Sequence, residues 1–524
     1  MRRLRAFGRR VEEIRPAFVL APLLAAHLAV VVVVAAQARH NGWLYGTDAG
    51  GHDWTAAWAL GHLWATDSGA WYGLAALLWP AALAFGGSLP AALPVVVVAQ
   101  VLVGGTAILL ATYGIGARIG GRLLGYAAAL GWVLAPVLSL GFFYGGDRVF
   151  QGVPYSDFRG LVRDIVVPHA LGLTSSAAFV SLVALTVAAW LLVRSLDTGD
   201  SNDVVLAALA AGFALGVDPA NAVFVPGVLV ALGLARRWRH ALAFLGALLP
   251  AAAALALWKA AGSGELPALP GFGFDLETLR INSTHLRGGG WSLLVVLWIA
   301  VAGSYGLVRK APAKGTLVAA WLAGFFVVLA GVPESGSVLA GTIFPSVQPG
   351  YAALVLLGAG SLLLVPGWGR PTRAAAAGEH WSRPSVAVAA AVLALGVYPL
   401  VLVGLASPVP PDRIVVKESP GRSVPVSAAF HLRAEGAALS WTAPAAAGTK
   451  LSYRIYRSPG PGCARAQEGS GECLLRMAGV GLVRGTTWTD LAPGFSYRVA
   501  ALADYRVDRA GGDLLLISPP VRAG

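Results

Sequence analysis

Charged residues are scarce in this chain of 524 residues: they make up 12% of it, whereas soluble domains carry about 25%. Cysteine occurs only twice, and only 5 of the 39 basic residues are lysine. The sequence has no Walker A loop, no nucleotide-binding glycine fingerprint, no His-x-x-x-His zinc pair and no Gly-x-Ser-x-Gly elbow. These absences exclude an ordinary soluble domain and give no sign of a soluble cofactor.

Apolar residues make up 56% of the chain and arrive in long blocks, with a mean hydropathy of +0.68. Blocks such as 17–36, 91–113 and 385–406 approach or exceed the ~20 residues that cross a bilayer. The first block is longer than the apolar core of a signal peptide, and many more follow it. We therefore predict a polytopic α-helical membrane protein with no nucleic-acid partner, despite its net charge of +13. The preference for Ala, Gly, Val and Arg is typical of GC-rich bacterial genomes, which indicates a bacterial plasma membrane.

The basic residues predict the orientation, because cytoplasmic loops hold most Arg and Lys. The tail 1–16 has six arginines and is expected in the cytoplasm. The block 72–85 is short and contains Pro80, so we interpret it as re-entrant or interfacial, since a full span there would invert every later loop. The eleven predicted spans are 17–38, 91–116, 122–143, 174–194, 204–217, 219–235, 240–260, 290–308, 315–332, 349–366 and 385–406.

With this topology, the tail and the inside loops hold 18 basic residues, while the outside loops before residue 407 hold seven. The predicted transmembrane domain covers 17–406. Its outer loops are 39–90, 144–173, 261–289 and 333–348, and a linker follows at 407–424. The remaining segment, 425–524, is expected outside the cell.

After residue 406 the sequence becomes polar, with alternating strand patterns. Trp441 lies on the expected second strand, and the run from Leu491 reads Leu-x-Pro-x-x-x-Tyr-x-Val, ending at Val499. This run resembles the tyrosine corner of fibronectin type III domains, so we expect an all-β sandwich over 425–524. The only cysteines, Cys463 and Cys473, flank a Gly/Ser-rich hairpin; outside the cell they predict a disulfide, with two free thiols as the alternative. The domain is expected either to bind a sugar or a partner or to act as a passive spacer.

The first outer loop contains Asp48-Ala-Gly-Gly-His52-Asp53, followed by the aromatic stretch 54–64. Asp48 is a candidate general base for an incoming hydroxyl. Alternatively, Asp48, His52 and Asp53 could hold a divalent ion such as Mg²⁺ or Mn²⁺ against a phosphate. A third interpretation is that these residues only cap and form a turn.

The second outer loop is long and charged. Its candidate phosphate-binding residues are Arg148, Arg159, Arg163 and His169, and the third outer loop adds Arg287. Arginine suits phosphate because its planar fork donates to two oxygens at once. The alternative is a set of solvated pairs with neighbouring aspartates. Between two short predicted spans, Asp218 could face the same cavity or cap a helix before Pro219.

Three features occur together: an early Asp in the first outer loop, an aromatic amphipathic stretch with a short apolar segment after it, and later the paired short spans around Leu215-Gly-Val-Asp218-Pro219. This combination resembles the GT-C class of integral membrane glycosyltransferases over about 15–260. Asp48-Ala-Gly-Gly-His52 looks closest to the loop of bacterial membrane proteins named "6-pyruvoyl-tetrahydropterin synthase-related". The resemblance implies polyprenyl-phosphate sugars as donors, Asp48 as the catalytic carboxylate, and second-loop Arg and His on the lipid phosphate. Unlike the class pattern, Asp48 and Asp53 are not adjacent.

The sequence thus predicts an enzyme that moves a sugar from a polyprenyl-phosphate lipid to a glycan or glycoprotein acceptor of the cell envelope. A non-catalytic scaffold for envelope assembly is one alternative, and it predicts that the outer-loop charges do not converge. A transporter of lipid-linked sugars is the other, although the predicted spans carry few charges.

Overall fold

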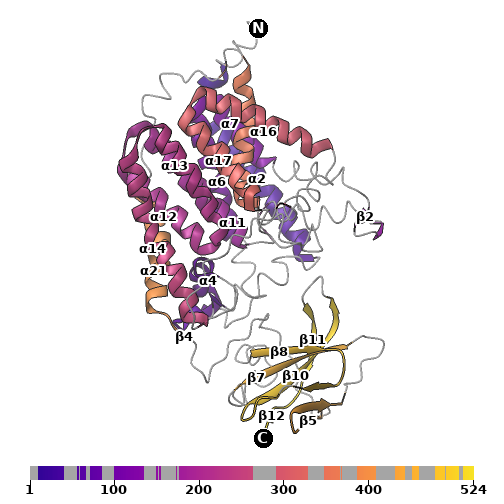
Figure 1. Ribbon diagram of the computed structural model, residues 1–524. Helices are drawn as coiled ribbons and strands as arrows, with labels where there is room; N and C mark the ends of the chain where they lie inside the picture. The colour runs from indigo at the N-terminus through magenta and orange to yellow at the C-terminus, as the bar shows by residue number, and fades with distance from the viewer. Residues whose placement is uncertain are drawn as a thin grey trace. The chain divides into compact units, whose positions relative to one another are not determined.

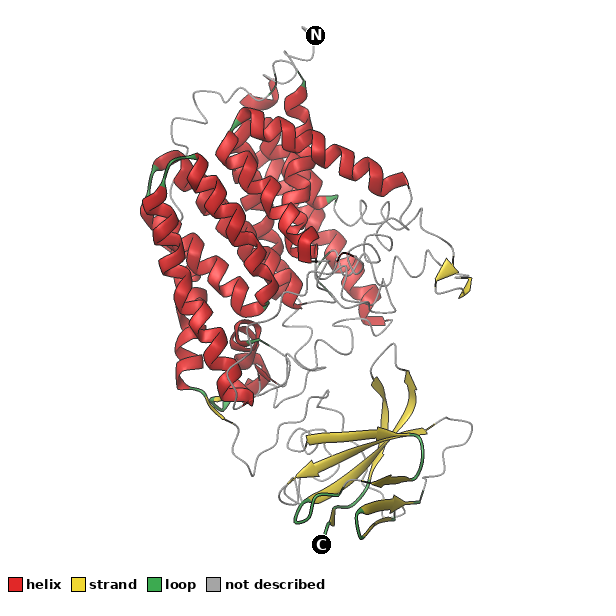
Figure 2. Cartoon of the chain, viewed as in Figure 1, coloured by secondary structure: helices red, strands yellow, loops and turns green. Residues whose placement is uncertain are grey.

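The computed structural model describes residues 10–40, 56–57, 59–65, 71–84, 99–134, 149–150, 153–154, 171, 173, 176–263, 276, 291–328, 347–365, 368, 386–408, 431–442, 451–458, 478–489, 491–506 and 511–524. Long helices dominate up to Leu405, and the larger sheets lie in the C-terminal part (Figure 1; Figure 2). The chain divides into two compact units. The first comprises Met1–Leu44, Val97–Ala254 and Ala268–Leu400, and the second Tyr45–Val96, Leu255–Pro267 and Val401–Gly524.

A helix lies within each of the eleven predicted spans. These helices are α2 (Pro16–His40), η1 (Gln100–Gly105) with α6 (Thr106–Gly120), α7 (Arg122–Val133), α11 (Ser176–Thr198), α12 (Ser201–Val217), η3 (Pro219–Val223) with α13 (Phe224–Leu234), α14 (Trp238–Ser263), α16 (Trp291–Lys310), α17 (Pro312–Val328), η4 (Gln348–Gly350) with α19 (Tyr351–Gly360) and η5 (Ser361–Leu364), and α21 (Val386–Leu405). Within the described ranges, five helices are long and apolar enough to cross a membrane. Several other apolar helices are shorter, so the count of eleven spans stays a prediction.

At one end of the first unit, side chains from the N-terminal tail and from the turns between helices bind one another. The sequence predicts that the tail and these turns lie on the same side of the membrane. In the N-terminal tail, the Glu12 carboxylate accepts hydrogen bonds from the backbone N–H groups of Arg122 (2.9 Å) and Leu123 (3.0 Å) at the start of α7. Asp197, near the end of α11, pairs with Arg118 near the end of α6 at 3.2 Å. The tail and two turns therefore meet at one end of the helices.

Two further ion pairs extend this network. Lys314, near the start of α17, also binds Asp197. Arg194 of α11 pairs with Asp203 of α12 at 2.9 Å, and both side chains are buried. A buried ion pair holds two helix ends in register, because separating it would leave a charge without compensation.

The contact between Glu12 and Arg122 constrains the topology. Residues at the same end of a helical bundle are separated by an even number of crossings. The helix α2 and the continuous helix η1–α6 supply two crossings between them. The short block at 72–85 forms helix α4 (Tyr72–Ala84), whose full crossing would make three. The interpretation of this block as a segment that does not span stays a prediction.

Close contacts between helices occur at glycines. A Cβ at Gly303 of α16 would collide with the carbonyl of Leu357 of α19, and one at Gly306 would lie 2.5 Å from the carbonyl of Gly360. Small residues three apart let two helix backbones approach, which is how helices associate in lipid. The glycines of α16 thus position α19.

The C-terminal segment forms two antiparallel sheets. Strands β5 (Leu432–Glu435), β6 (Ala438–Trp441) and β9 (Thr487–Thr489) make the first sheet, in the order β5-β6-β9. Strands β7 (Leu451–Ser458), β8 (Ala478–Val483), β10 (Ser496–Arg506) and β11 (Gly511–Ile517) make the second, in the order β11-β10-β7-β8, with β12 (Val521–Arg522) paired to β10. In the second sheet β10 pairs with β7 and not with its predecessor in the chain. The chain passes from β8 to β9 in the first sheet before it returns to the second sheet in β10.

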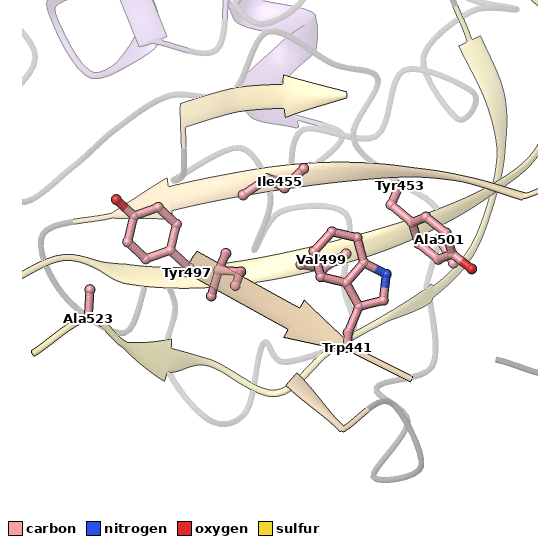
Figure 3. Close-up of a cluster of buried hydrophobic side chains, with 8 residues drawn as sticks. Trp441, Tyr453, Ile455, Tyr497, Val499, Ala501 and Ala523 are labelled. Carbon is pink, nitrogen blue, oxygen red and sulfur yellow. The ribbon is translucent and has the colours of Figure 1, made fainter. Parts of the chain in front are cut away.

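Both sheets contribute to one hydrophobic core (Figure 3). Trp441 from β6 meets Tyr453 from β7 edge-on, with ring centroids 5.3 Å apart. Ile455 and Val499 are fully buried beside them. The hydroxyl of Tyr497 accepts a hydrogen bond from the backbone N–H of Ala492 at 2.7 Å. This is the local bond that the sequence pattern around Tyr497 predicts.

Candidate functional site

The predicted catalytic and phosphate-binding residues lie outside the described residues. They are Asp48, His52, Asp53, Arg148, Arg159, Arg163, His169 and Arg287, and the same holds for Cys463 and Cys473. Their convergence, their metal binding and the disulfide therefore stay predictions. The described segments of the second unit that adjoin the first outer loop and the end of α14 form the candidate site.

The aromatic stretch after Asp53 is described in part. Residues 56–57 and 59–61 are helical, and Ala56, Ala57, Ala59 and Leu60 are fully buried. The rings of His62 and Trp64 stack with centroids 5.0 Å apart. This stretch is thus anchored by its small apolar residues just before an aromatic pair.

A short parallel pairing fixes the end of this stretch. Strand β1 (Trp64–Ala65) pairs with β4 (Ser407–Pro408), directly after α21. The backbone N–H of Ser407 donates to the carbonyl of Leu63 at 2.9 Å. The first predicted outer loop and the residues that lead into the C-terminal segment are therefore joined through their backbones.

A cation and an aromatic ring meet where α4 begins and α14 nears its end. The Nζ atom of Lys259 lies 4.5 Å from the ring centroid of Trp71. Both side chains are partly exposed, whereas the adjacent Tyr72 and Trp258 are buried. An ammonium over a Trp face is attracted by the negative face of the ring. Lys259, at the end of the predicted span 240–260, is the only lysine before Lys310 in the sequence.

Asp218 serves as a helix cap, which decides between the two interpretations of this residue. Its Oδ1 accepts from the N–H of Ala220 at 2.9 Å at the start of η3. Burial raises the pKa of the Asp218 carboxyl above its ordinary value, and the hydrogen bond from Ala220 opposes this shift. Asn221 behind it donates to the Ser181 hydroxyl (2.8 Å) and the Ala214 carbonyl (2.7 Å). The pair of short helices is thus closed by a local polar network.

His27 is a candidate that the sequence interpretation missed. It lies near the middle of α2 and is 2% exposed. Neither ring nitrogen has a hydrogen-bond partner within the described structure, and the Nε1 atom of Trp132, whose ring centroid is 5.9 Å away, has none either. A Cβ at Gly105, in the π-helical turn η1, would lie 2.6 Å from His27 Nε2. A histidine inside an apolar span was the available signal, because ionisable residues there are costly and tend to mark function.

Among the described residues, no three His, Cys, Asp or Glu side chains are grouped so that they could hold a metal ion. The Mg²⁺ or Mn²⁺ site proposed for Asp48, His52 and Asp53 lies outside those residues. The described part of the second unit therefore offers a cationic and aromatic surface, suited to an anion or to a flat apolar group.

Neither protein-family models nor curated proteins match the chain. Solved structures of the Archaeoglobus fulgidus oligosaccharyltransferase do match it, at low similarity. The apo form is 13% identical with a TM-score of 0.27, and the match covers 73% of this chain and 56% of that one. The complex with an inhibitory peptide and a dolichol-phosphate is 14% identical with a TM-score of 0.26 and the same coverage. The complex with Zn and sulfate is 13% identical, and 53% of that chain is covered.

The chain thus spans about half the length of these structures. TM-scores in this range do not establish a shared fold, so the function has to be argued from the residues of this chain.

Proposed function

We propose that the protein is an integral membrane glycosyltransferase of the GT-C type, which transfers a sugar from a polyprenyl-phosphate donor to a cell-envelope acceptor on the outer face. The single observation that supports this best is the contact between Lys259 and Trp71. It puts a cation beside an aromatic face in the same compact unit as the first outer loop.

A polyprenyl-phosphate sugar presents an anionic phosphate at the membrane surface and an apolar chain below it. Lysine binds phosphate as a point charge, and tryptophan prefers the headgroup zone. Lys259 near the end of α14 and Trp71 just before α4 thus fit the two parts of such a donor. Arg148, Arg159, Arg163, His169 and Arg287 would add charge-assisted hydrogen bonds to the phosphate.

In the proposed reaction, the acceptor hydroxyl attacks the anomeric carbon of the sugar. The bond from that carbon to the phosphate oxygen breaks, and the polyprenyl phosphate leaves with the bonding electrons. Asp48 accepts the hydroxyl proton, and the basic side chains stabilise the charge that develops on the leaving phosphate. His52 and Asp53 position the acceptor or a divalent ion beside Asp48.

The C-terminal segment is proposed to be a fibronectin type III-like sandwich that holds the acceptor. The strand order, the shared core around Trp441 and the hydrogen bond at Tyr497 support this family assignment. The pairing of β1 with β4, at the start of the linker to this segment, would help to keep the acceptor near Asp48. We propose a bacterial plasma membrane, with the tail 1–16 in the cytoplasm and this domain outside.

The test is sugar transfer by membranes that contain the protein, supplied with a labelled polyprenyl-phosphate sugar. We expect Asp48→Ala to reduce transfer by roughly 10²–10⁴-fold, the usual contribution of a general base. The matched control is Asp67→Ala, which removes a carboxylate from the same loop and should leave transfer near the wild-type rate. Equal transfer by the wild type and Asp48→Ala would contradict the role of Asp48. An inactive wild type with all polyprenyl-phosphate sugars would contradict the function itself.

A second comparison tests the described residues. Lys259→Gln should raise the KM for the lipid donor, whereas Lys259→Arg should restore most of the affinity because it keeps the positive charge. An unchanged KM in Lys259→Gln would exclude this lysine from the donor site.

A further inference from the structure

The turn between α13 and α14 carries exposed positive charge that no described acidic residue neutralises. Arg236 and Arg239 are both exposed, and neither forms an ion pair within the described structure. The nearby acids are already engaged, since Asp197 binds Arg118 and Lys314. Asp200 and Asp203 likewise lie against Arg194. The two exposed arginines are therefore available to an anion from outside the protein.

The turn itself is held rigidly against the helical bundle. The guanidinium of Arg237 donates to the carbonyl of Ser195, and His240 Nε2 lies 3.2 Å from the carbonyl of Gly199. The backbone of Arg236 adopts a positive φ of 55°, which reverses the chain in a short turn. A turn fixed in this way presents Arg236 and Arg239 without a large loss of backbone entropy on binding.

Along α14, which begins beside these arginines, exposed apolar side chains follow on one face. Trp238 is 66% exposed, and its ring packs over Gly233, where a Cβ would lie 3.3 Å from the ring. Leu242 and Leu249 follow at 70% and 67% exposure, four and eleven residues after Trp238 on the same helix. Residues at this spacing share one face of a helix. The exposed leucines therefore continue the surface that Trp238 begins.

We propose that this surface binds an anionic phospholipid with two acyl chains from the surrounding membrane. Arg236 and Arg239 hold the headgroup phosphate by charge-assisted hydrogen bonds. The indole of Trp238 lies at the headgroup depth that this side chain prefers. One acyl chain follows Leu242 and Leu249 along α14. The turn is predicted to face the cytoplasm, where anionic headgroups attract clustered basic residues near a span.

This lipid is distinct from the proposed sugar donor. Arg236 and Lys259 lie at opposite ends of α14, which is 26 residues long and therefore about 39 Å from end to end. The lipid site thus does not depend on the glycosyltransferase assignment and would be retained if that assignment failed.

The test is native mass spectrometry of the full-length protein in detergent, titrated with phosphatidylglycerol or phosphatidylcholine. We expect tighter binding of phosphatidylglycerol to the wild type. The double variant Arg236→Gln/Arg239→Gln should weaken that binding by about 25-fold, at roughly fivefold for each arginine. Phosphatidylcholine binding should change little.

The matched control is Arg309→Gln/Lys310→Gln. These two residues are exposed and basic at the end of α16, and they are predicted to lie on the same side. An equal loss in both double variants, or no loss in either, would overturn the proposal, because binding would then follow net charge and not this site. If the first double variant does not purify as a folded protein, the single variant Arg239→Gln applies the same test with an expected fivefold loss.

A competition experiment with glycerol phosphate completes the test. It should fail to compete with phosphatidylglycerol at equal concentration, because it lacks the acyl chains that contact α14. Equal competition would mean that the turn binds a free phosphate group, and the lipid assignment would be wrong. Trp238→Ala should weaken phosphatidylglycerol binding even with both arginines present, and unchanged binding in this variant would also contradict the proposed acyl contact.

Discussion

Glu12 provides a direct test of how the N-terminal tail stabilises the helical unit. Its carboxylate accepts two backbone hydrogen bonds at the start of α7, at 2.9 and 3.0 Å, and the residue is 7% exposed. It thus acts as a helix cap supplied by a residue about 110 positions away in the sequence. The preceding Gly121 has a φ of 90°, and a Cβ there would lie 2.5 Å from the carboxylate of Glu12.

The expected cost of Glu12→Ala follows from these contacts. Loss of a helix cap destabilises proteins by ~0.5–2 kcal/mol. Buried N–H groups left without a partner cost ~1–3 kcal/mol. Both figures describe the loss of the same two hydrogen bonds, so we expect Glu12→Ala to lower the free energy of unfolding by about 1–3 kcal/mol. Glu12→Gln keeps an acceptor oxygen but loses the charge, so its effect should be smaller, at about 1–2 kcal/mol.

The assay is reversible unfolding of the full chain in detergent, followed by circular dichroism. Glu13→Ala is the matched control because Glu13 is adjacent and exposed. An exposed substitution of this kind should cost less than about 0.5 kcal/mol. If Glu12→Ala and Glu13→Ala unfolded at the same denaturant concentration, the capping argument, and with it the topological use of this contact, would be refuted.

Three further outcomes are expected. Gly303→Ala should destabilise the protein by ~1–3 kcal/mol in the same unfolding assay, because its methyl group would collide with the backbone of α19. Gly246→Ala, whose methyl group would meet nothing within 4 Å, is the control and should be neutral or slightly stabilising. Gly105→Ala should be destabilised by its clash with the His27 ring, and His27→Ala in the same chain should recover about 1 kcal/mol; additive effects would contradict the contact. Tyr497→Phe should cost about 1 kcal/mol and accelerate amide hydrogen exchange in β10, and unchanged exchange there would contradict the tyrosine-corner assignment.

The helices were predictable because each apolar block is long and bounded by Gly, Pro or Arg. The turn at Gly121 and the Asp218–Pro219 cap are local signals of this kind, since a single residue type ends or begins the helix there. The strands were predictable in part from a different signal, the alternation of apolar and polar residues after residue 406, and this signal missed β5 and β8. The π-helical turn Gln100–Gly105 was not predicted, and the close approach of the His27 ring to Gly105 within it is a contact between two helices far apart in the sequence.

Contacts between distant segments were also beyond the sequence. In the sequence Glu12 is an acidic residue in a basic tail, and no neighbouring residue predicts its hydrogen bonds to the start of α7. Lys259 was counted as one of seven basic residues outside, and only the fold brings it to Trp71. The predicted roles of Asp48 and the outer-loop arginines rest on residue type and spacing alone, so they stay predictions until the variants are measured.

The distribution of acids between the two ends of the helices argues for where the chemistry takes place. At the end that holds the N-terminal tail, Glu12 caps α7, Asp197 bridges Arg118 and Lys314, and Asp203 is buried against Arg194. The oxygens of these carboxylates are already occupied by partners within the protein, so these groups are poorly placed to accept a proton from a substrate hydroxyl.

At the opposite end, Asp218 is likewise engaged by the backbone of Ala220. A catalytic carboxylate for the proposed transfer is then expected in the predicted outer loops, which contain Asp48 and Asp53. Among single Asp→Asn and Glu→Gln variants, activity should therefore disappear only for substitutions in these loops. Loss of activity in Asp197→Asn, without loss of folded protein, would contradict the assignment of this acid to a structural role.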